Sequence, residues 1–431
     1  MIWIVNSLLI SAWCFILLRQ PAPASLKPFL VPGLAFKLVA GILVGLLYQL
    51  YYKEEGDTFF LFNLASYLAE LLPRRATDFF NIVLFNKFDS ESKTFFFIWN
   101  QPRALFFVKI LAIVNIVTQS NYWLSSLYLS LFSFSGLWYL ASWLVREREI
   151  PAYLAALAFL FFPSFVFWSS GVLKESVMTG CMGFLIVSSL HLLQPGAKHK
   201  SRHGIITLIA FIILLQLKYY YAGIIGAMLI AYSLTKITLR QNSFRIPAPS
   251  CILFGLFLTI GFLLATFLHP NTRLSAFPQA LYTNYQATLA QNTHPDYTFS
   301  EFAPTWTSII QNAPRALYQG LFGPDLQTAR ATIQIPAALE NLFLGLLLFV
   351  IISYRSYTRQ WAFSTESVAV LTYVLISAVL MAYASPNFGS LIRYKTGFIP
   401  FLILLAGYRN PLIDYFLSGS EIRRQKGQPG S

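Results

Sequence analysis

The chain has 431 residues, of which 56% are hydrophobic and only 11% are charged, with a mean hydropathy of +0.59. Soluble domains carry about 25% charged residues, so this composition excludes a soluble globular protein and indicates a polytopic membrane protein. The formal net charge is +14. Its cations lie in short segments between apolar runs, which is the positive-inside pattern of membrane proteins, and no basic aromatic stripe indicates nucleic-acid binding.

Apolar runs that approach the length of a membrane-crossing helix recur along the whole chain. They predict an all-α polytopic membrane protein, one integral membrane domain over residues 1–431, with about 11–13 transmembrane helices. The first run has no basic residue before it and ends before Arg19, so it is interpreted as a signal anchor or first membrane helix. The runs are 2–18, 32–52, 104–118, 122–145, 152–168, 175–194, 204–217, 219–235, 250–268, 337–353, 366–384 and 396–410.

The distribution of Lys and Arg between the runs predicts which side of the membrane each loop occupies. The cation-rich segments predicted to be cytoplasmic are Lys198–His203, Lys236–Arg245, Arg355–Arg359 and Arg409–Lys426. Alternation then places the loops around Asp57, Trp168–Glu175 and Ser385–Lys395 outside. Arg146–Glu149 is also predicted to be cytoplasmic, so an odd number of crossings must lie between an outside Asp57 and Arg146. Two runs, 104–118 and 122–145, lie there. Either run 104–118 therefore does not cross, or part of 58–100 does.

Two long extracytoplasmic regions are predicted, at 53–103 and 269–336. The first contains two amphipathic pieces, Thr58–Leu72 and Ala76–Phe88, that fit the interface plane. The second is polar, and a loop of that length is usually functional or disordered; its many aromatic residues favour order. The three cysteines lie inside apolar runs and the five histidines show no ligand spacing, so no cofactor and no Cys or His metal site is predicted, and the sequence leaves a requirement for a divalent metal open.

Three acids, Glu54, Glu55 and Asp57, stand where the apolar run 32–52 meets water. A carboxylate at the outer interface can act as a general base on an acceptor hydroxyl or can ligate a cation. They are the candidate catalytic residues. The alternative is structural: Asp57 caps the helix that begins at Thr58, and the two glutamates are solvated.

A second candidate stretch runs from Phe162 to Glu175, where an apolar helix ends at Pro-Ser and Ser-Ser-Gly turns. Lys174 and Glu175 then open the next run. The functional interpretation is that Lys174 meets a phosphate and that Glu175 binds a sugar or positions Lys174. The alternative is an interfacial turn with Trp168 in the aromatic belt.

A third candidate stretch, Ser385–Lys395, places cations on the side where the positive-inside rule disfavours them. Arg offers a planar fork to phosphate oxygens and Lys a point charge, whereas the alternative is two snorkelling side chains at a helix start. The candidate substrate-binding residues here and elsewhere outside are Asn387, Arg393, Tyr394, Lys395, Lys218 beside Tyr219–Tyr221, and Arg315 after Pro314.

This layout resembles the C-type glycosyltransferases, integral membrane enzymes that use polyprenyl-phosphate sugars, and in particular their bacterial members similar to dolichyl-phosphate-mannose protein mannosyltransferases. The matching features are the acidic stretch Glu54–Asp57, the pair Tyr139–Arg148 and Pro151–Pro163, a large later outside loop, and a late Arg-containing segment. The family often has Asp-Glu where this chain has Gly-Asp, and an extra helix precedes the usual first one. The resemblance implies that Asp57 is the catalytic base and Arg393 a lipid-phosphate ligand.

The expected function is therefore a glycosyltransferase of the bacterial inner membrane that makes envelope polysaccharide or other glycans. It would transfer a sugar from a polyprenyl-phosphate donor to a glycan or lipid acceptor on the outer face. Alternatives are an O-antigen polymerase or ligase-like enzyme, a transporter or flippase, and a structural assembly protein. Transporters carry ionisable groups near the bilayer midplane and often show inverted repeats; here the charges gather at helix ends and no repeat is visible.

Overall fold

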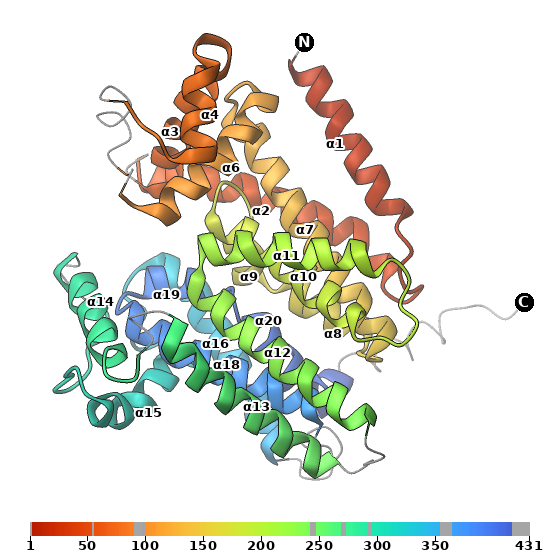
Figure 1. Ribbon diagram of the computed structural model, residues 1–431, viewed down its shortest axis with the longest axis vertical. Coiled ribbons are helices and arrows are strands. Elements are labelled where there is room, and N and C mark those ends of the chain that lie inside the picture. The colour runs from red at the N-terminus through yellow and green to blue at the C-terminus, as the bar shows by residue number, and fades with distance from the viewer. Residues whose placement is uncertain are drawn as a thin grey trace, which may run out of the picture. The chain divides into compact units, whose positions relative to one another are not determined.

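The computed structural model describes residues 2–53, 56–89, 98, 100–241, 247–268, 273–291, 295–353 and 364–415. Over these residues the chain is all-α and contains no strand (Figure 1). Residue contacts divide it into two compact units, Met1–Gly223 and Ile224–Ser431, with the boundary inside one helix. The predicted single membrane domain is not tested by this division and stays a prediction.

The first unit is a bundle of helices, and those that the structure describes range from five to 26 residues. Two π-helical turns, η2 and η3, and one 3-10 turn, η1, extend or precede its helices. The elements are α1 (Ile2–Arg19), η1 (Lys27–Phe29), α2 (Leu30–Leu46), η2 (Leu47–Tyr51), α3 (Asp57–Arg74), α4 (Ala76–Phe85), α6 (Pro102–Thr118), α7 (Tyr122–Glu147), α8 (Ala152–Ala156), η3 (Leu157–Phe161), α9 (Pro163–Trp168), α10 (Lys174–Leu192) and α11 (Lys200–Leu217).

The second unit begins within α12 and contains the remaining helices. Its elements are α12 (Tyr219–Gln241), α13 (Pro247–Leu268), α14 (Phe277–Gln291), α15 (Trp306–Phe322), η5 (Thr332–Gln334), α16 (Ile335–Ser353), α18 (Thr365–Ala384), α19 (Phe388–Lys395) and α20 (Ile399–Gly407). Helices α19 and α20 are bent by 64° at a short break.

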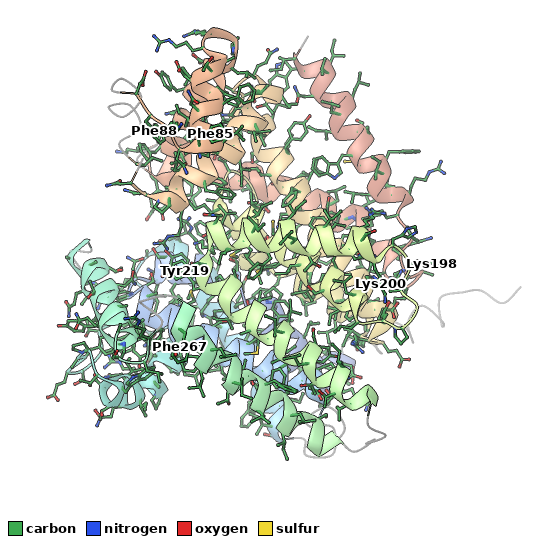
Figure 2. The ribbon with its side chains drawn as sticks, viewed as in Figure 1. Phe85, Phe88, Lys198, Lys200, Tyr219 and Phe267 are labelled. Carbon is green, nitrogen blue, oxygen red and sulfur yellow. The ribbon has the colours of Figure 1, made fainter. Side chains whose placement is uncertain are left out.

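Among the described residues, eight helices are long and apolar enough to cross a membrane, or up to nine if α19 and α20 form one bent span. The predicted run 104–118 forms α6, which has 17 residues, and further apolar helices are shorter still. Large apolar side chains are exposed on many helices, such as Phe267, which is 85% exposed (Figure 2). Because lipid covers such surfaces, the structure is that of an all-α, multi-pass membrane protein, as the sequence predicts.

The predicted helix 152–168 is wrong as a single element. Helix α8 continues into η3, and Phe162 then adopts an extended backbone (ψ 116°) before Pro163 opens α9. Proline cannot continue a helix and pushes the residue before it towards the extended region. A separate helix of six residues, α9, therefore starts at Pro163, and the turn 169–173 follows it.

Helices α7 and α10 pack closely through glycines. A Cβ atom on Gly136 would lie 2.1 Å from the carbonyl oxygen of Gly180, so only a hydrogen fits there. Small residues allow such close approach between membrane helices. The two helices run parallel, since Ser133 bonds Thr179 at 2.9 Å and Gln194 bonds Glu147 at 3.2 Å. Their first residues consequently lie at the same end of the unit.

Both predicted extracytoplasmic regions contain helices. In the first, α3 and α4 correspond to the predicted amphipathic pieces, and the Lys109 ammonium on α6 bonds the Asn86 side chain after α4 at 2.5 Å. In the second, α14 and α15 enclose an aromatic cluster in which Phe299 and Phe302 lie against Tyr383 of α18 at ring distances of 4.8 and 5.1 Å. Over the residues described, the second region therefore contains helices that pack with its aromatic side chains, and the expectation of order for the whole region stays a prediction.

Candidate functional site

The turn 169–173 lies between α2 and α7 and is held by buried serines. Gly171 has a left-handed backbone (φ +73°), and its N–H donates to Ser130 Oγ at 2.9 Å. A side chain there would be strained and would meet the Gly41 carbonyl at 3.0 Å, so glycine is required at this position. The fixed turn places Lys174 and Glu175 at the start of α10.

The start of α3 is fastened to this turn through Thr58. The Thr58 hydroxyl donates to the carbonyl oxygen of Val172 at 2.8 Å and lies 3.0 Å from the Tyr122 hydroxyl of α7. Since the threonine proton is used on Val172, the tyrosine donates to Thr58. We call Thr58, Tyr122 and Val172 the Thr58 junction. It is buried and fixes where the acidic stretch ends relative to Lys174 and Glu175.

The acids themselves are only partly described. Glu54, Glu55 and the side chain of Asp57 lie outside the described residues, while the backbone of Asp57 forms the first residue of α3. Gly56, just before it, packs on the ring of Tyr48, where a Cβ atom would come within 2.2 Å of a ring carbon. Both flanks of Asp57 are thus held by close contacts.

Glu175 and Lys218 form a buried ion pair of 3.0 Å. Glu175 is on α10, and Lys218 lies between α11 and α12, so the fold joins two predicted site residues that stand far apart in sequence. The Lys218 ammonium also lies 5.9 Å from the ring centroid of Tyr220. Lys174, the first residue of α10, is half-buried. Lys174 and Glu175, which carry opposite charges, therefore follow within three residues of Val172, to which the start of α3 is bonded.

A buried lysine in α2 was missed by the sequence reasoning. Lys37 is 2% exposed, its ammonium donates to Ser169 Oγ at 2.5 Å, and it lies 5.7 Å from the ring centroid of Phe165. An ionisable residue deep inside an apolar run was the available signal, since such residues mark functional sites in membrane proteins.

In the second unit, Lys395 has a structural role. Its ammonium donates to the carbonyl oxygens of Leu321 and Gly323, at 2.9 and 2.6 Å, and to Asn341 Oδ1 at 3.2 Å. An ammonium has three donors, so the protein uses all of them. Two of them satisfy backbone carbonyls at the end of α15 that helix geometry leaves open.

The other predicted residues of the second unit lie on two helices. Asn387 caps α19 by accepting the Ser390 N–H at 3.2 Å, and Arg393 and Tyr394 lie half-buried on that helix. Arg315 is exposed on α15. The loop before α15 is anchored on α19, because Asp296 accepts the Phe388 N–H at 2.6 Å. Nearby, burial raises the pKa of Tyr297 well above its usual value.

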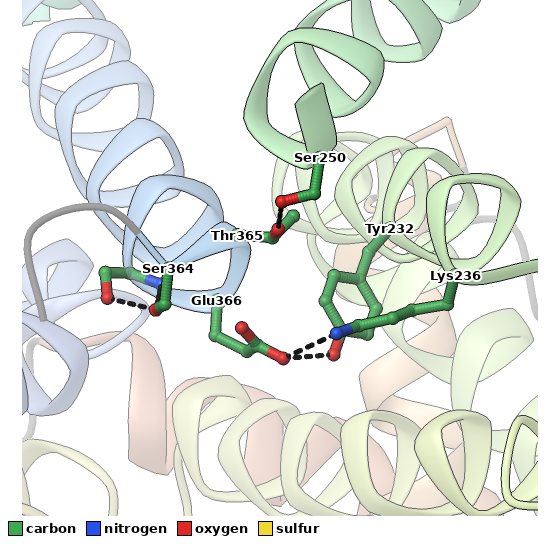
Figure 3. Close-up of polar contacts among 7 residues, drawn as sticks. Tyr232, Lys236, Ser250, Ser364, Thr365 and Glu366 are labelled. Carbon is green, nitrogen blue, oxygen red and sulfur yellow. Dashed lines mark hydrogen bonds and ion pairs between the residues drawn. The ribbon is translucent and has the colours of Figure 1, made fainter. Parts of the chain in front are cut away.

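A polar cluster joins α12, α13 and α18 (Figure 3). Glu366 accepts a hydrogen bond of 2.6 Å from Tyr232 and lies 3.1 Å from the Lys236 ammonium, and Thr365 donates to Ser250 at 2.7 Å. A carboxylate in the first turn of α18 is favoured by the helix dipole. The sequence does not reveal this cluster, because its α18 members lie more than a hundred residues after those of α12 and α13.

Comparison with known proteins adds no family assignment: no protein family, no curated protein and no solved structure matches the chain. Function therefore rests on the residues. Over the described part of the chain no three His, Cys, Asp or Glu side chains gather in a way that could hold a metal.

Proposed function

We propose that the protein is a membrane glycosyltransferase that uses a polyprenyl-phosphate-linked sugar as donor and a glycan or lipid as acceptor. The observation that carries this proposal is the Thr58 junction. It bonds Thr58, the residue after Asp57, to the Val172 carbonyl. Val172 lies two residues before Lys174 and three before Glu175, which pairs with Lys218. A carboxylate that can accept a proton and cations that can bind a phosphate then lie in the same part of the first unit.

The chemistry needs both charges. The acceptor hydroxyl gives its proton to the carboxylate of Asp57 while its oxygen bonds the anomeric carbon of the sugar. The bond from that carbon to the phosphate oxygen breaks, and the phosphate leaves with the electron pair. Lys174 stabilises the negative charge that develops on the phosphate. Glu175 fixes Lys218 and keeps this corner from carrying an uncompensated positive charge.

The test is Asp57→Asn, which keeps the size of the side chain and its ability to accept a hydrogen bond but removes the base. Glycan product per inserted protein should fall by roughly 10²–10⁴-fold. The matched control is Asp78→Asn, because Asp78 is a carboxylate in the first turn of the adjacent α4 and forms a 4.0 Å exposed ion pair with Arg75. The control should retain product.

Near-normal product from a normally inserted Asp57→Asn protein would remove Asp57 as catalyst.

The resemblance also assigns Arg393 to the lipid phosphate. Losing a charged hydrogen bond to phosphate costs roughly 1.5–3 kcal/mol. Arg393→Ala should therefore lower donor use by about 10- to 150-fold, and Arg355→Ala, on the predicted cytoplasmic side, should not.

A flippase is the second candidate, and Lys37 is the observation that favours it. Transporters bind substrates near the bilayer midplane, at ionisable side chains and broken helices. Lys37 is buried within α2 and bonds Ser169, just after the broken segment of α8, η3 and α9. If this function is the correct one, Lys37→Met abolishes lipid-linked sugar flipping in proteoliposomes while Asp57→Asn leaves it intact. An O-antigen polymerase or ligase-like enzyme remains a further alternative within the transferase class.

A further inference from the structure

Helix α15 exposes a row of apolar side chains on the side away from α18. The first member of the row, Trp306, also stacks on Phe277 of α14, with 5.5 Å between the ring centroids, and donates its indole N–H to the Leu274 carbonyl at 2.8 Å. Trp306, Ile310 and Tyr318 are 37%, 67% and 46% exposed, and Pro314 completes the row at the same spacing of four residues. The opposite face, with Ser308, Ile309, Ala316, Gln319 and Gly320, is buried. Residues four apart lie on one face of a helix, so this row is continuous. We call it the α15 stripe.

The stripe has a polar row beside it. Thr307, Gln311 and Arg315, each one residue after a member of the stripe, are also exposed. An apolar row next to a row with polar and basic side chains is the pattern of a helix that lies in a membrane surface, with its apolar side towards the acyl chains.

The position of α15 against α18 agrees with that pattern. Tyr383, in the last turn of α18, donates its hydroxyl proton to the Ile309 carbonyl at 2.6 Å. Gly320 packs on Ala378, six residues before the end of α18, which is about 9 Å along a helix. Helix α18 is long and apolar enough to cross the membrane. The start of α15 therefore lies at the depth where α18 ends, and the rest of α15 continues beside α18 towards the membrane interior.

The end of α15 is sealed as a helix end near hydrocarbon must be. Water cannot satisfy open carbonyls there, so protein donors have to. Lys395 bonds the carbonyls of Leu321 and Gly323, and Asn341 of α16 donates to the Pro324 carbonyl at 2.8 Å. These donors come from α16 and α19, which belong to candidate membrane spans.

The stripe also adjoins a surface that faces lipid. Phe322, one turn after Tyr318, lies against α16 at Gly345. Helix α16 is long and apolar enough to cross the membrane and exposes Leu339 and Leu342 by 53% and 60%. A row of apolar side chains next to such a surface is covered by the same lipid.

We infer that α15 is an interfacial helix whose stripe contacts the acyl chains of the bilayer. Arg315, in the neighbouring row, extends to the phosphates of the lipid headgroups. The predicted extracytoplasmic region 269–336 is then partly embedded in the membrane surface. The partner is bulk phospholipid, so the inference stands whether or not the protein is a glycosyltransferase.

The test compares two adjacent positions, Ile310 in the stripe and Gln311 beside it. In the full-length protein with Cys14, Cys181 and Cys251 replaced by alanine, a nitroxide spin label is placed on Ile310→Cys or on Gln311→Cys. Each protein is reconstituted in vesicles of phosphatidylcholine and phosphatidylglycerol. The ratio of collisions with oxygen to collisions with a water-soluble nickel chelate should be severalfold higher at position 310 than at 311, because oxygen concentrates in hydrocarbon.

Two results would overturn the inference. Equal ratios with frequent nickel collisions at both positions would show a stripe that faces water. Few collisions with either agent at 310 would show that protein, such as a second copy of the chain, covers it. The protein with its three native cysteines gives an independent measurement. Brominated lipids should quench a component of its tryptophan fluorescence, and this component should be absent from Trp306→Phe. Identical quenching of the two proteins would also refute the inference.

Discussion

Lys218 in the first unit and Lys395 in the second are both buried lysines at helix ends, but their surroundings differ. Lys218 is paired with the carboxylate of Glu175. The three acceptors around Lys395 are neutral: two backbone carbonyls and one side-chain amide. An ion pair cancels charge inside the protein, whereas neutral acceptors satisfy the donors and leave the charge to be balanced over a longer distance, here by the Glu340 carboxylate. The first lysine is thus paired with a carboxylate, and the second is bonded to the end of a helix.

This difference predicts the largest effect for breaking the ion pair. Glu175→Gln leaves Lys218 as a buried charge without its counter-ion, which costs about 3–5 kcal/mol of unfolding free energy. Lys218→Met should cost a similar amount. The double variant removes both charges and should regain most of the loss, as measured by unfolding in bicelles. Losses that simply add in the double variant would contradict the pair as the source of the effect.

Lys395→Met should cost less and should have no single rescuing partner. Three acceptors lose their donor, at about 1–3 kcal/mol for each buried group left unsatisfied, but the cost of burying a charge is also removed. We expect a net loss below that of Glu175→Gln. Amide hydrogen exchange should rise at the end of α15, near Leu321 and Gly323. A rise spread evenly over the second unit would show that Lys395 does not act on this helix end.

The sequence predicts much of the fold and less of the site, for physical reasons. Hydropathy is a local property, so runs such as 122–145 identify their helices, and the Pro-Ser turn at Pro163 indicates where the run 152–168 is interrupted. Lys174 and Glu175 were correctly placed at a helix start. The partner of Glu175, however, is 43 residues further on, and that of Lys395 is a helix end more than 70 residues before it. Tertiary packing alone makes such pairs.

Lys37 offers a third kind of buried lysine and a smaller effect. It has one hydrogen-bond acceptor among the described residues, the Ser169 hydroxyl, and the ring of Phe165 beside it. Replacing a poorly compensated buried charge by an apolar side chain of similar length is often neutral or stabilising. Lys37→Met should therefore leave the unfolding free energy unchanged or raise it by about 1 kcal/mol. A loss as large as that of Glu175→Gln would show that Lys37 is fully compensated in the folded protein.

The smallest effect is expected at Asp325, which, like Lys395, is surrounded by neutral partners. Partial burial alone would raise the pKa of Asp325, but hydrogen bonds from Thr328, Tyr318 and the N–H of Gln327 hold this pKa below its usual value. A depressed pKa adds stability above the unfolded pKa of about 3.9, and this is lost as pH falls through the folded pKa. Asp325→Asn should cost no more than about 1 kcal/mol at pH 7. The difference from the unmodified protein should shrink below about pH 4. A difference that stays constant from pH 7 to pH 3 would mean that the ionised carboxylate contributes nothing beyond its shape.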